Sequence, residues 1–253
     1  MDVKCEIAAN TNVGRQRFRN EDNFIILEKF SLAIVADGMG GHVDGDVASR
    51  IVTETLNERY DSLYAEKVND DDDQIKSQEQ FLAESIECAN FKIFEKNQGV
   101  FSLESMGTTV VGLQITPCGH SITACVGDSR IYRIRDEEIE QITEDHSLVG
   151  ELLRHNIIHE KDLMFLQNKN IITRALGMGQ NVTVDTKVHK LQNNDIFLLC
   201  TDGLSDLVEN DPVLQIVLNS ADLEETVANL IDAANDAGGS DNITVALVKV
   251  QCE

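Results

Sequence analysis

Four short runs of apolar and β-branched residues follow one another between residues 108 and 141, with only a few turn residues between them. Connections this short join antiparallel neighbours, because a parallel pair needs a crossover of a dozen or more residues. Similar runs occur before and after this region. We expect strands near residues 3–9, 23–28, 31–36, 108–116, 120–126, 130–135, 138–141, 195–200 and 242–250. The chain is therefore expected to fold around antiparallel sheets rather than an alternating strand–helix array.

Three other segments carry apolar residues at helical spacing. The pattern predicts helices over residues 46–68 and 78–97, where apolar residues recur every three or four positions. A third helix is predicted to begin after Asp222, with Glu225 completing a capping box, and to end at Gly238. Two sheets with helices packed outside them are the simplest arrangement for this length, so we expect an α+β fold in a single domain.

The charge of the chain limits its partners. Forty-four acidic residues against twenty-one basic ones give a net charge of −23. Nucleic acids and anionic membranes are bound through Lys and Arg, so neither is an expected partner. No apolar run approaches the ~20 residues of a membrane span, and a secretory signal is not expected at the N-terminus. The six cysteines form no CxxC pair, and we expect them to be reduced in the cytoplasm.

Acidic residues stand where several of the expected strands begin or end. Three apolar runs finish on an aspartate: LAIVADG at Asp37, ITACVGDS at Asp128 and IFLLCTDG at Asp202. Two further runs are preceded by acids, at Asp241 and at Glu21–Asp22. A single Asp-Gly pair usually makes a tight turn. Carboxylates from neighbouring strand ends, however, meet at one rim and repel unless a cation lies between them.

Hard divalent cations are the natural occupants of such a rim. Mg²⁺ and Mn²⁺ take oxygen ligands from a few carboxylates and keep several waters. Gly38 would remove a side chain where a backbone carbonyl could approach a metal. His155 and His159 are four residues apart, but HNIIH lacks the glutamate of the zinc-protease motifs, so we interpret both as surface histidines.

Eight short motifs occur in order along the chain: VGRQRFRNEDNF, VADGMGGHVDGDVAS, MGTTVVG, ACVGDSRIYRIR, ITEDHSLV, IITRALG, CTDGLSDLV and GGSDNITVALV. Together they resemble the metal-dependent serine/threonine protein phosphatases of type 2C, in the compact single-domain form common in bacteria. The resemblance extends from about Thr11 to Val250. It implies an αββα sandwich of two antiparallel sheets flanked by helix pairs. It also implies one domain over residues 1–253, with a flap over about 143–176.

The resemblance implies roles for individual residues. A pair of Mn²⁺ or Mg²⁺ ions would be held by four aspartates: Asp22, Asp37, Asp202 and Asp241. The Gly38 carbonyl is implied as a further ligand, and Glu21 would act through water. Asp128 matches the position that many bacterial members use for a weaker third metal. Arg17 matches the phosphate-binding arginine, and Asn242 follows the last metal aspartate as it does in the family.

The implied reaction is hydrolysis of phosphoserine and phosphothreonine in proteins. A hydroxide bridging two metals at Asp37 and Asp202 would attack phosphorus in line with the departing oxygen, while Arg17 stabilises the equatorial oxygens. His42 is a candidate general acid, and a metal-bound water is the alternative. Eukaryotic members place a histidine directly after the DG pair, where this chain has Met39. A Ser/Thr kinase of the same cell and its substrates are the implied partners, and nothing requires more than a monomer.

Other functions can be weighed on the same residues. A thiol-based phosphatase is unsupported, because four residues separate Cys125 from Arg130 where its phosphate loop needs five. No GxxxxGK[ST] motif is present, which disfavours a P-loop hydrolase. A catalytically silent phosphoprotein-binding module and a purely structural metal site both stay open. The presence of all four metal aspartates favours catalysis over the first, and activity after metal loading would distinguish the second.

Overall fold

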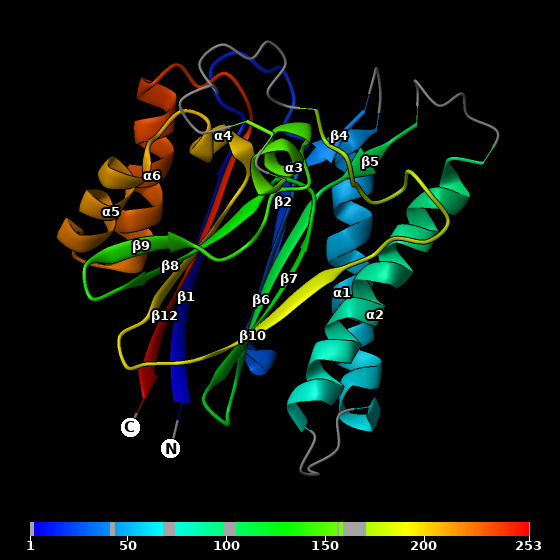
Figure 1. The fold of residues 1–253 in the computed structure, drawn as a ribbon, viewed down its shortest axis with the longest axis horizontal. Helices are drawn as coiled ribbons and strands as arrows, with labels where there is room; N and C mark the ends of the chain where they lie inside the picture. The colour runs from blue at the N-terminus through cyan, green and yellow to red at the C-terminus, as the bar shows by residue number, and fades with distance from the viewer. Residues whose placement is uncertain are drawn as a thin grey trace.

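Two five-stranded antiparallel sheets form the centre of the computed structural model, shown in Figure 1. The structure describes residues 3–40, 44–67, 74–98, 105–155, 157–158 and 171–252. The first sheet has the order β1 (Val3–Asn12), β12 (Ile243–Cys252), β11 (Ile196–Cys200), β8 (Arg130–Arg135) and β9 (Glu138–Gln141). The second has the order β10 (Asp185–Lys190), β7 (His120–Val126), β6 (Val110–Thr116), β3 (Leu32–Ala36) and β2 (Asn23–Leu27). A short pair, β4 (Gly38–Met39) and β5 (Gly107–Thr108), lies beside them.

Helices cover the outer face of each sheet. On the second sheet lie α1 (Gly45–Lys67) and α2 (Gln74–Lys96), and on the first lie α5 (Asn210–Asn219) and α6 (Leu223–Asp236). Two short helices, α3 (Leu148–Arg154) and α4 (Asp202–Ser205), lie near the top of Figure 1, and a 3₁₀ turn, η1, spans Glu28–Phe30. The αββα arrangement predicted from the sequence is confirmed.

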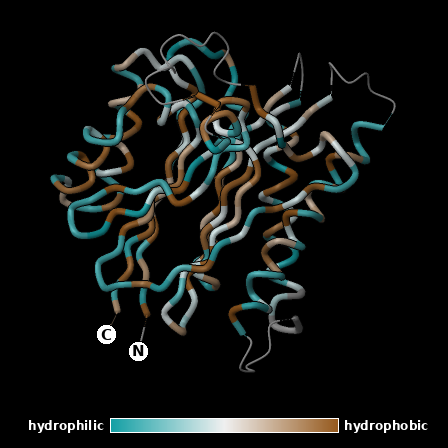
Figure 2. Tube along the Cα trace, in the orientation of Figure 1, coloured by the Kyte–Doolittle hydropathy of each residue, from teal (hydrophilic) through white to brown (hydrophobic). Residues whose placement is uncertain are grey.

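The alternation of side chains along the strands builds three apolar layers. In β3, Ile34 faces α1 and α2, whereas Val35 faces the other sheet. In β11, Leu198 faces α5 and α6, and Leu199 faces the interior between the sheets. Successive strand residues point to opposite faces, so a fully apolar strand contributes to two layers at once. Figure 2 shows hydrophobic residues along the central strands and hydrophilic ones on the outer loops.

All nine predicted strand regions and all three predicted helices are present, with bounds shifted by a few residues. The cap of α6 is also confirmed: the Asp222 side chain accepts a hydrogen bond from the Glu225 N–H at 2.8 Å. The Glu225 side chain bonds to the N–H of Ala221 rather than to that of Asp222, so the box closes one residue earlier than expected. Gly238 follows the helix with a φ of +127°, as its role in ending the helix requires.

Six elements of the described chain were not expected from the sequence: the strands β4 and β10, the 3₁₀ turn η1, and the helices α3, α4 and α5. The edge strand β10 has the sequence DTKVHK, in which polar residues predominate because only β7 pairs with it. Helix α5 is short but has Pro212 in its first turn, a position where proline favours helix initiation.

All six cysteines are free, and Cys125 and Cys200 are buried in the strands β7 and β11. Among the residues that the structure describes, no helix is both long and apolar enough to cross a membrane.

Candidate metal centre

The predicted acidic residues meet at one rim because of the strand register. Asn23 pairs with Ala36, so Asp22 and Asp37 stand side by side just beyond this pair. In the other sheet Cys200 pairs with both Val245 and Arg130, which brings the segments of Asp202, Asp241 and Asp128 to the same end. This is the upper rim in Figure 1, opposite the two termini.

The acids at this rim strongly perturb one another. Burial, and then the charges of Asp202 and Asp241, raise the pKa of Asp22 to about 7, even though hydrogen bonds from two threonines lower it. Burial and the same neighbours raise the pKa of Asp37 well above its ordinary value. Burial and Asp241 raise the pKa of Asp202 to about 6, partly offset by a hydrogen bond with Asp37. To be ionised together near neutral pH, these carboxylates need positive charge between them.

Buried carboxylate oxygens without partners mark where that charge would bind. Both Thr201 and Thr244 donate hydrogen bonds to Asp22 Oδ2, at 3.0 and 2.6 Å. Among the residues that the structure describes, the other oxygen, Asp22 Oδ1, has no hydrogen-bond partner, and neither does Asp202 Oδ1. Leaving a buried acceptor unsatisfied is costly, and a carboxylate more so than a neutral group. These oxygens are the hard ligands that Mg²⁺ and Mn²⁺ prefer, so the residues present fit such ions.

The protein ligands alone do not form a closed coordination shell. In the described part of the chain, no group of three or more His, Cys, Asp or Glu side chains is arranged to hold a metal ion by itself. Structural zinc sites are closed by four such ligands, so the rim does not fit that class. Hydrated Mg²⁺ or Mn²⁺ bound through one or two carboxylates and several waters does fit.

Gly38 has a second reason to lack a side chain. A Cβ there would lie 2.2 Å from the Gly45 carbonyl oxygen and 2.4 Å from that of Glu21. The segment after Asp37 thus packs backbone to backbone against the start of α1 and against Glu21. Ser49 of α1 donates a hydrogen bond to the same Glu21 carbonyl at 2.6 Å. This packing places the Gly38 and Glu21 backbones beside the aspartate cluster.

Asn242 joins the N-terminal loop to the last strand. Its Oδ1 accepts a hydrogen bond from the Glu21 N–H at 2.8 Å, and its Nδ2 donates to the carbonyls of Val13 and Arg19 at 3.0 and 2.9 Å. The loop held in this way carries Arg17, whose Nη2 lies 2.6 Å from Asp241 Oδ2. The predicted phosphate-binding arginine therefore lies against a predicted metal ligand.

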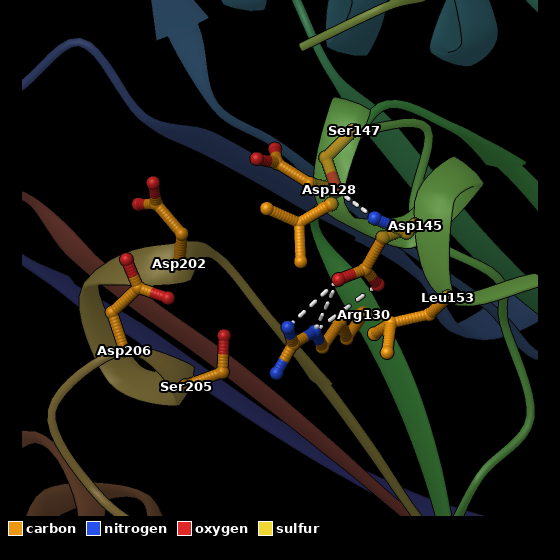
Figure 3. Close-up of a pocket in the computed structure, with 10 residues that line it drawn as sticks. Asp128, Arg130, Asp145, Ser147, Leu153, Asp202, Ser205 and Asp206 are labelled. Carbon is orange, nitrogen blue, oxygen red and sulfur yellow. Dashed lines mark hydrogen bonds and ion pairs between the residues drawn. The ribbon is translucent and has the colours of Figure 1, made fainter. Parts of the chain in front are cut away.

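Asp128 lines a separate cavity of about 170 Å³ beside the cluster, shown in Figure 3. Across it stand Asp202, the first residue of α4, and Asp206, which directly follows α4, and helix α3 forms another wall. Burial, and then the charges of Asp202 and Asp145, raise the pKa of Asp128 to about 7. Arg130 does not neutralise Asp128, because its guanidinium binds Asp145, with Nη2 at 2.7 Å from Oδ2.

Several residues that hold the site were missed from the sequence. Thr109 accepts a hydrogen bond from the Asp37 N–H through Oγ1 at 3.1 Å, and its own N–H donates to the Asp37 carbonyl at 2.9 Å. The same hydroxyl is 2.7 Å from Ser129 Oγ, next to Asp128. The MGTTVVG motif contains Thr109, but nothing in its spacing indicates this contact. Asp206 was also missed, although an acid four residues after Asp202 would lie on the same face of a helix and could have been predicted to share its site.

Of the three histidines considered in the sequence, only His155 lies among the described residues. His42, the candidate general acid, lies outside the described residues, and so does His159. His155 is exposed after α3, as expected of a surface histidine. Met39, which replaces the eukaryotic histidine, lies in β4 and is paired with Gly107.

Comparisons with known proteins agree with this geometry. A family model described as protein phosphatase 2C matches residues 15–247. The serine/threonine phosphatase stp of Listeria innocua is 40% identical over 246 residues, which are 94% of this chain and 93% of that protein. The structure of serine/threonine phosphatase Stp1 from Staphylococcus aureus superposes with a TM-score of 0.87 at 30% identity, over 100% of this chain and 98% of that chain.

A second solved structure contains metal. It is the catalytic domain of the serine threonine protein phosphatase PstP in complex with two manganese ions, with a TM-score of 0.84 at 30% identity, covering 99% of this chain and 100% of that chain. The two-sheet fold, the rim of aspartates and the match over most of the sequence agree with one another. The chain belongs to the protein phosphatase 2C family, as its ordered motifs predicted.

Proposed function

We propose that this chain hydrolyses phosphoserine and phosphothreonine in proteins at the rim formed by Asp22, Asp37, Asp202 and Asp241, with two Mn²⁺ or Mg²⁺ ions bound there. The observation that carries the proposal is this cluster of buried carboxylates, with raised pKa values and two unpartnered oxygens. The relatives named as serine/threonine phosphatases and the manganese ions in PstP support it.

Four aspartates and one backbone carbonyl would bind the two ions. Asp37, Asp202 and Asp241 would ligate the ions with the Gly38 carbonyl, while Asp22, held by two hydroxyls, offers its free oxygen to the same space. When bound, the two ions supply a nucleophilic water of lowered pKa and neutralise phosphoryl charge. The Asp37 and Asp202 carboxylates would hold the ions on the side of the phosphoryl group from which such a water attacks.

Arg17 is placed to bind the phosphoryl group. Its planar guanidinium can donate two parallel hydrogen bonds to phosphate oxygens. It already lies against Asp241 and is about half exposed, so a phosphate entering from solvent meets it beside the ions. The general acid is not assigned, because His42 lies outside the described residues.

The proposal also covers a third ion, the opposing enzyme, the oligomeric state and the cellular location. A weaker third ion is proposed in the cavity of Asp128, Asp202 and Asp206. We also propose a Ser/Thr kinase as the opposing enzyme, a monomeric state, and one domain with a flap over about 143–176. The six free cysteines support a reducing, cytoplasmic location.

The direct test is release of phosphate from p-nitrophenyl phosphate and from a phosphothreonine peptide, with Mn²⁺, with Mg²⁺ and with EDTA. We expect turnover with either metal and none with EDTA. A phosphoprotein-binding module would instead bind the peptide without releasing phosphate. Folded protein that binds Mn²⁺ but releases no phosphate from either substrate would overturn the proposed function.

Replacing Arg17 by alanine is expected to raise KM for the phosphopeptide by about 10- to 100-fold, the worth of a charge-assisted hydrogen-bond pair, with a smaller change in kcat. Steady-state kinetics at saturating Mn²⁺ measure it. The matched control is Arg15→Ala on the same loop, because Arg15 binds Asn235 and Asp236 rather than the aspartate cluster. An equal rise in KM in both variants would remove the phosphate role of Arg17.

A further inference from the structure

His146, in the motif ITEDHSLV, is buried and has no part in the proposed chemistry, yet both of its ring nitrogens are engaged. Nδ1 lies 3.0 Å from the backbone N of Gly127, and Nε2 lies 2.9 Å from Asp185 Oδ2. The side chain is only 1% exposed. A buried polar group with specific partners on both sides is typical of a residue that fixes other parts of the structure.

These contacts determine where the ring proton lies. A backbone N–H can only donate, so Nδ1 must accept from Gly127 and carry no proton. The proton is therefore on Nε2, from which it is donated to Asp185. Arg174 Nη1 also lies 3.1 Å from Nε2, but it donates its two hydrogens to Asp185 Oδ1 and to the Thr183 carbonyl rather than to the ring. The other oxygen of Asp185 accepts from Arg174 Nη1 at 2.6 Å, which keeps this carboxylate charged and oriented. Asp185 and Arg174 thus hold the imidazole in one tautomer and one orientation.

Gly127, which bonds to Nδ1 of the ring, has an unusual backbone conformation that these contacts stabilise. Gly127 has a φ of +109°, and a Cβ there would lie 2.6 Å from the side chain of Thr109. Only glycine adopts this conformation easily. His146 bonds to Gly127 twice, because its own N–H also donates to the Gly127 carbonyl at 2.8 Å. The next residue is Asp128, so the direction of that carboxylate depends on this pair of bonds.

The backbone of His146 also closes the base of the flap. Its carbonyl accepts a hydrogen bond from the Thr173 N–H at 2.8 Å, and the Leu148 N–H donates to Ile171 O at 2.8 Å. Ser147, between them, forms a bridge with Ile172. Residues 146–148 and 171–173, which we call the flap base, are therefore joined at the residue that holds Gly127.

We propose that His146 is a positioning residue that holds residues 127–129, the Asp128 loop, and the flap base as one unit. Its imidazole, kept in the Nε2–H tautomer by Asp185, fixes the loop, and its backbone fixes the base. The cation affinity of the Asp128 cavity and the stability of the hydrogen bonds within the flap base then depend on one another. The inference rests on the proposed role of Asp128 as a metal ligand.

Two near-isosteric variants separate the ring nitrogens. His146→Asn keeps an acceptor near the position of Nδ1 and so keeps the bond to Gly127. His146→Gln keeps a donor near the position of Nε2, and so the bond to Asp185, but loses Gly127. Calorimetric titration with Mn²⁺ alone should show the weaker class of site losing about tenfold in affinity in His146→Gln, the effect of leaving a buried donor unpaired. His146→Asn should stay within about twofold of wild type.

Two readouts that do not depend on turnover complete the test. Hydrogen exchange of the Gly127, Leu148 and Thr173 amides should be faster in metal-free His146→Gln than in His146→Asn. Nitrogen NMR of labelled histidine should show an unprotonated Nδ1 for the signal that disappears in either variant. A protonated Nδ1, or equal exchange in the two variants, would overturn the inference.

Asp128→Asn distinguishes failure of the inference from failure of the proposed function. The double variant His146→Gln/Asp128→Asn should bind Mn²⁺ no more weakly than Asp128→Asn alone. If the two effects add in full, His146 does not act through Asp128 and the inference is wrong. If Asp128→Asn alone leaves Mn²⁺ binding unchanged, it is the proposed third site that fails, and the coupling to metal affinity fails with it.

Discussion

Replacing Asp202 by asparagine is expected to lower kcat on the order of 10³-fold or more and to leave the fold intact. The change removes the charge of a proposed metal ligand whose buried Oδ1 has no hydrogen-bond partner among the described residues, at a position that the proposed two-metal rim shares with the Asp128 cavity. Metal stabilisation of transition-state charge contributes several kcal/mol, and each 1.36 kcal/mol is tenfold in rate. Phosphopeptide turnover at saturating Mn²⁺ measures the loss.

The fold should survive because the substitution removes repulsion from Asp241, while the amide can still hydrogen-bond with Asp37. Asp202 has a raised pKa caused by burial and by Asp241, so a neutral amide of the same shape is easily accommodated. The matched control is Asp236→Asn, which removes an exposed carboxylate of α6 that pairs with Arg15. Wild-type kcat is expected there. Near-normal turnover in Asp202→Asn would contradict the assignment of the site.

Without metal, the protein is expected to become less stable as pH rises from about 5 to 8. The pKa values of Asp22 and Asp128 are raised to about 7 and that of Asp202 to about 6. An acid whose pKa is higher in the folded state binds its proton more tightly there, so its contribution is present below pH ~4 and is lost as pH rises through the folded pKa. For a fully buried carboxyl, a shift of about three units corresponds to an upper bound of ~4 kcal/mol.

Urea denaturation at several values of pH, in EDTA and in saturating Mn²⁺, measures how the free energy of unfolding changes with pH. Buried His146 and half-buried His189, whose pKa values are lowered mainly by desolvation, act in the opposite direction below pH 6.5, so the comparison is sharpest between pH 6.5 and 8. Mn²⁺ should remove the decline, because the cation supplies the missing positive charge. Asp128→Asn should reduce the slope in EDTA. A flat or rising curve in EDTA would mean that the rim tolerates its charges without metal.

The two experiments together decide between catalysis and a structural metal site. Both readings predict that chelation destabilises the protein near pH 8. Only a catalytic centre predicts that the metal-loaded wild type releases phosphate and that metal-loaded Asp202→Asn does not.

How far the sequence could predict the site depends on the range of each contact. Asp37, Asp128 and Asp202 could be predicted to converge because each ends an apolar strand, and strand ends of neighbouring sheets share a rim. The hydroxyls that hold Asp22 could not, because Thr201 and Thr244 are about 180 and 220 residues away. The β11–β12 register places these threonines beside each other, and Asp22 meets them from the other sheet. Local patterns contain no information about such a register.

The same limit explains the missed elements. Strand β10 gains its place from pairing with β7, and its own residues are polar enough to form a loop. Helix α5 was a different kind of miss, because Pro212 and the apolar residues after it were visible. The link from His146 to Gly127 spans only 19 residues, yet it depends on a φ that a sequence does not display.

The position of β12 in the first sheet has a consequence for the order of events during synthesis. This strand lies between β1 and β11, although it is the last of the strands to leave the ribosome. Until it inserts, β1 has no neighbour in its sheet, and neither Asp241 nor the Asn242 clamp on the N-terminal loop is in place. Pairings between such distant segments form slowly. A nascent chain that has been made only as far as α6 therefore lacks two residues of the proposed catalytic centre, and we expect dephosphorylation to begin only after synthesis has passed the last strand.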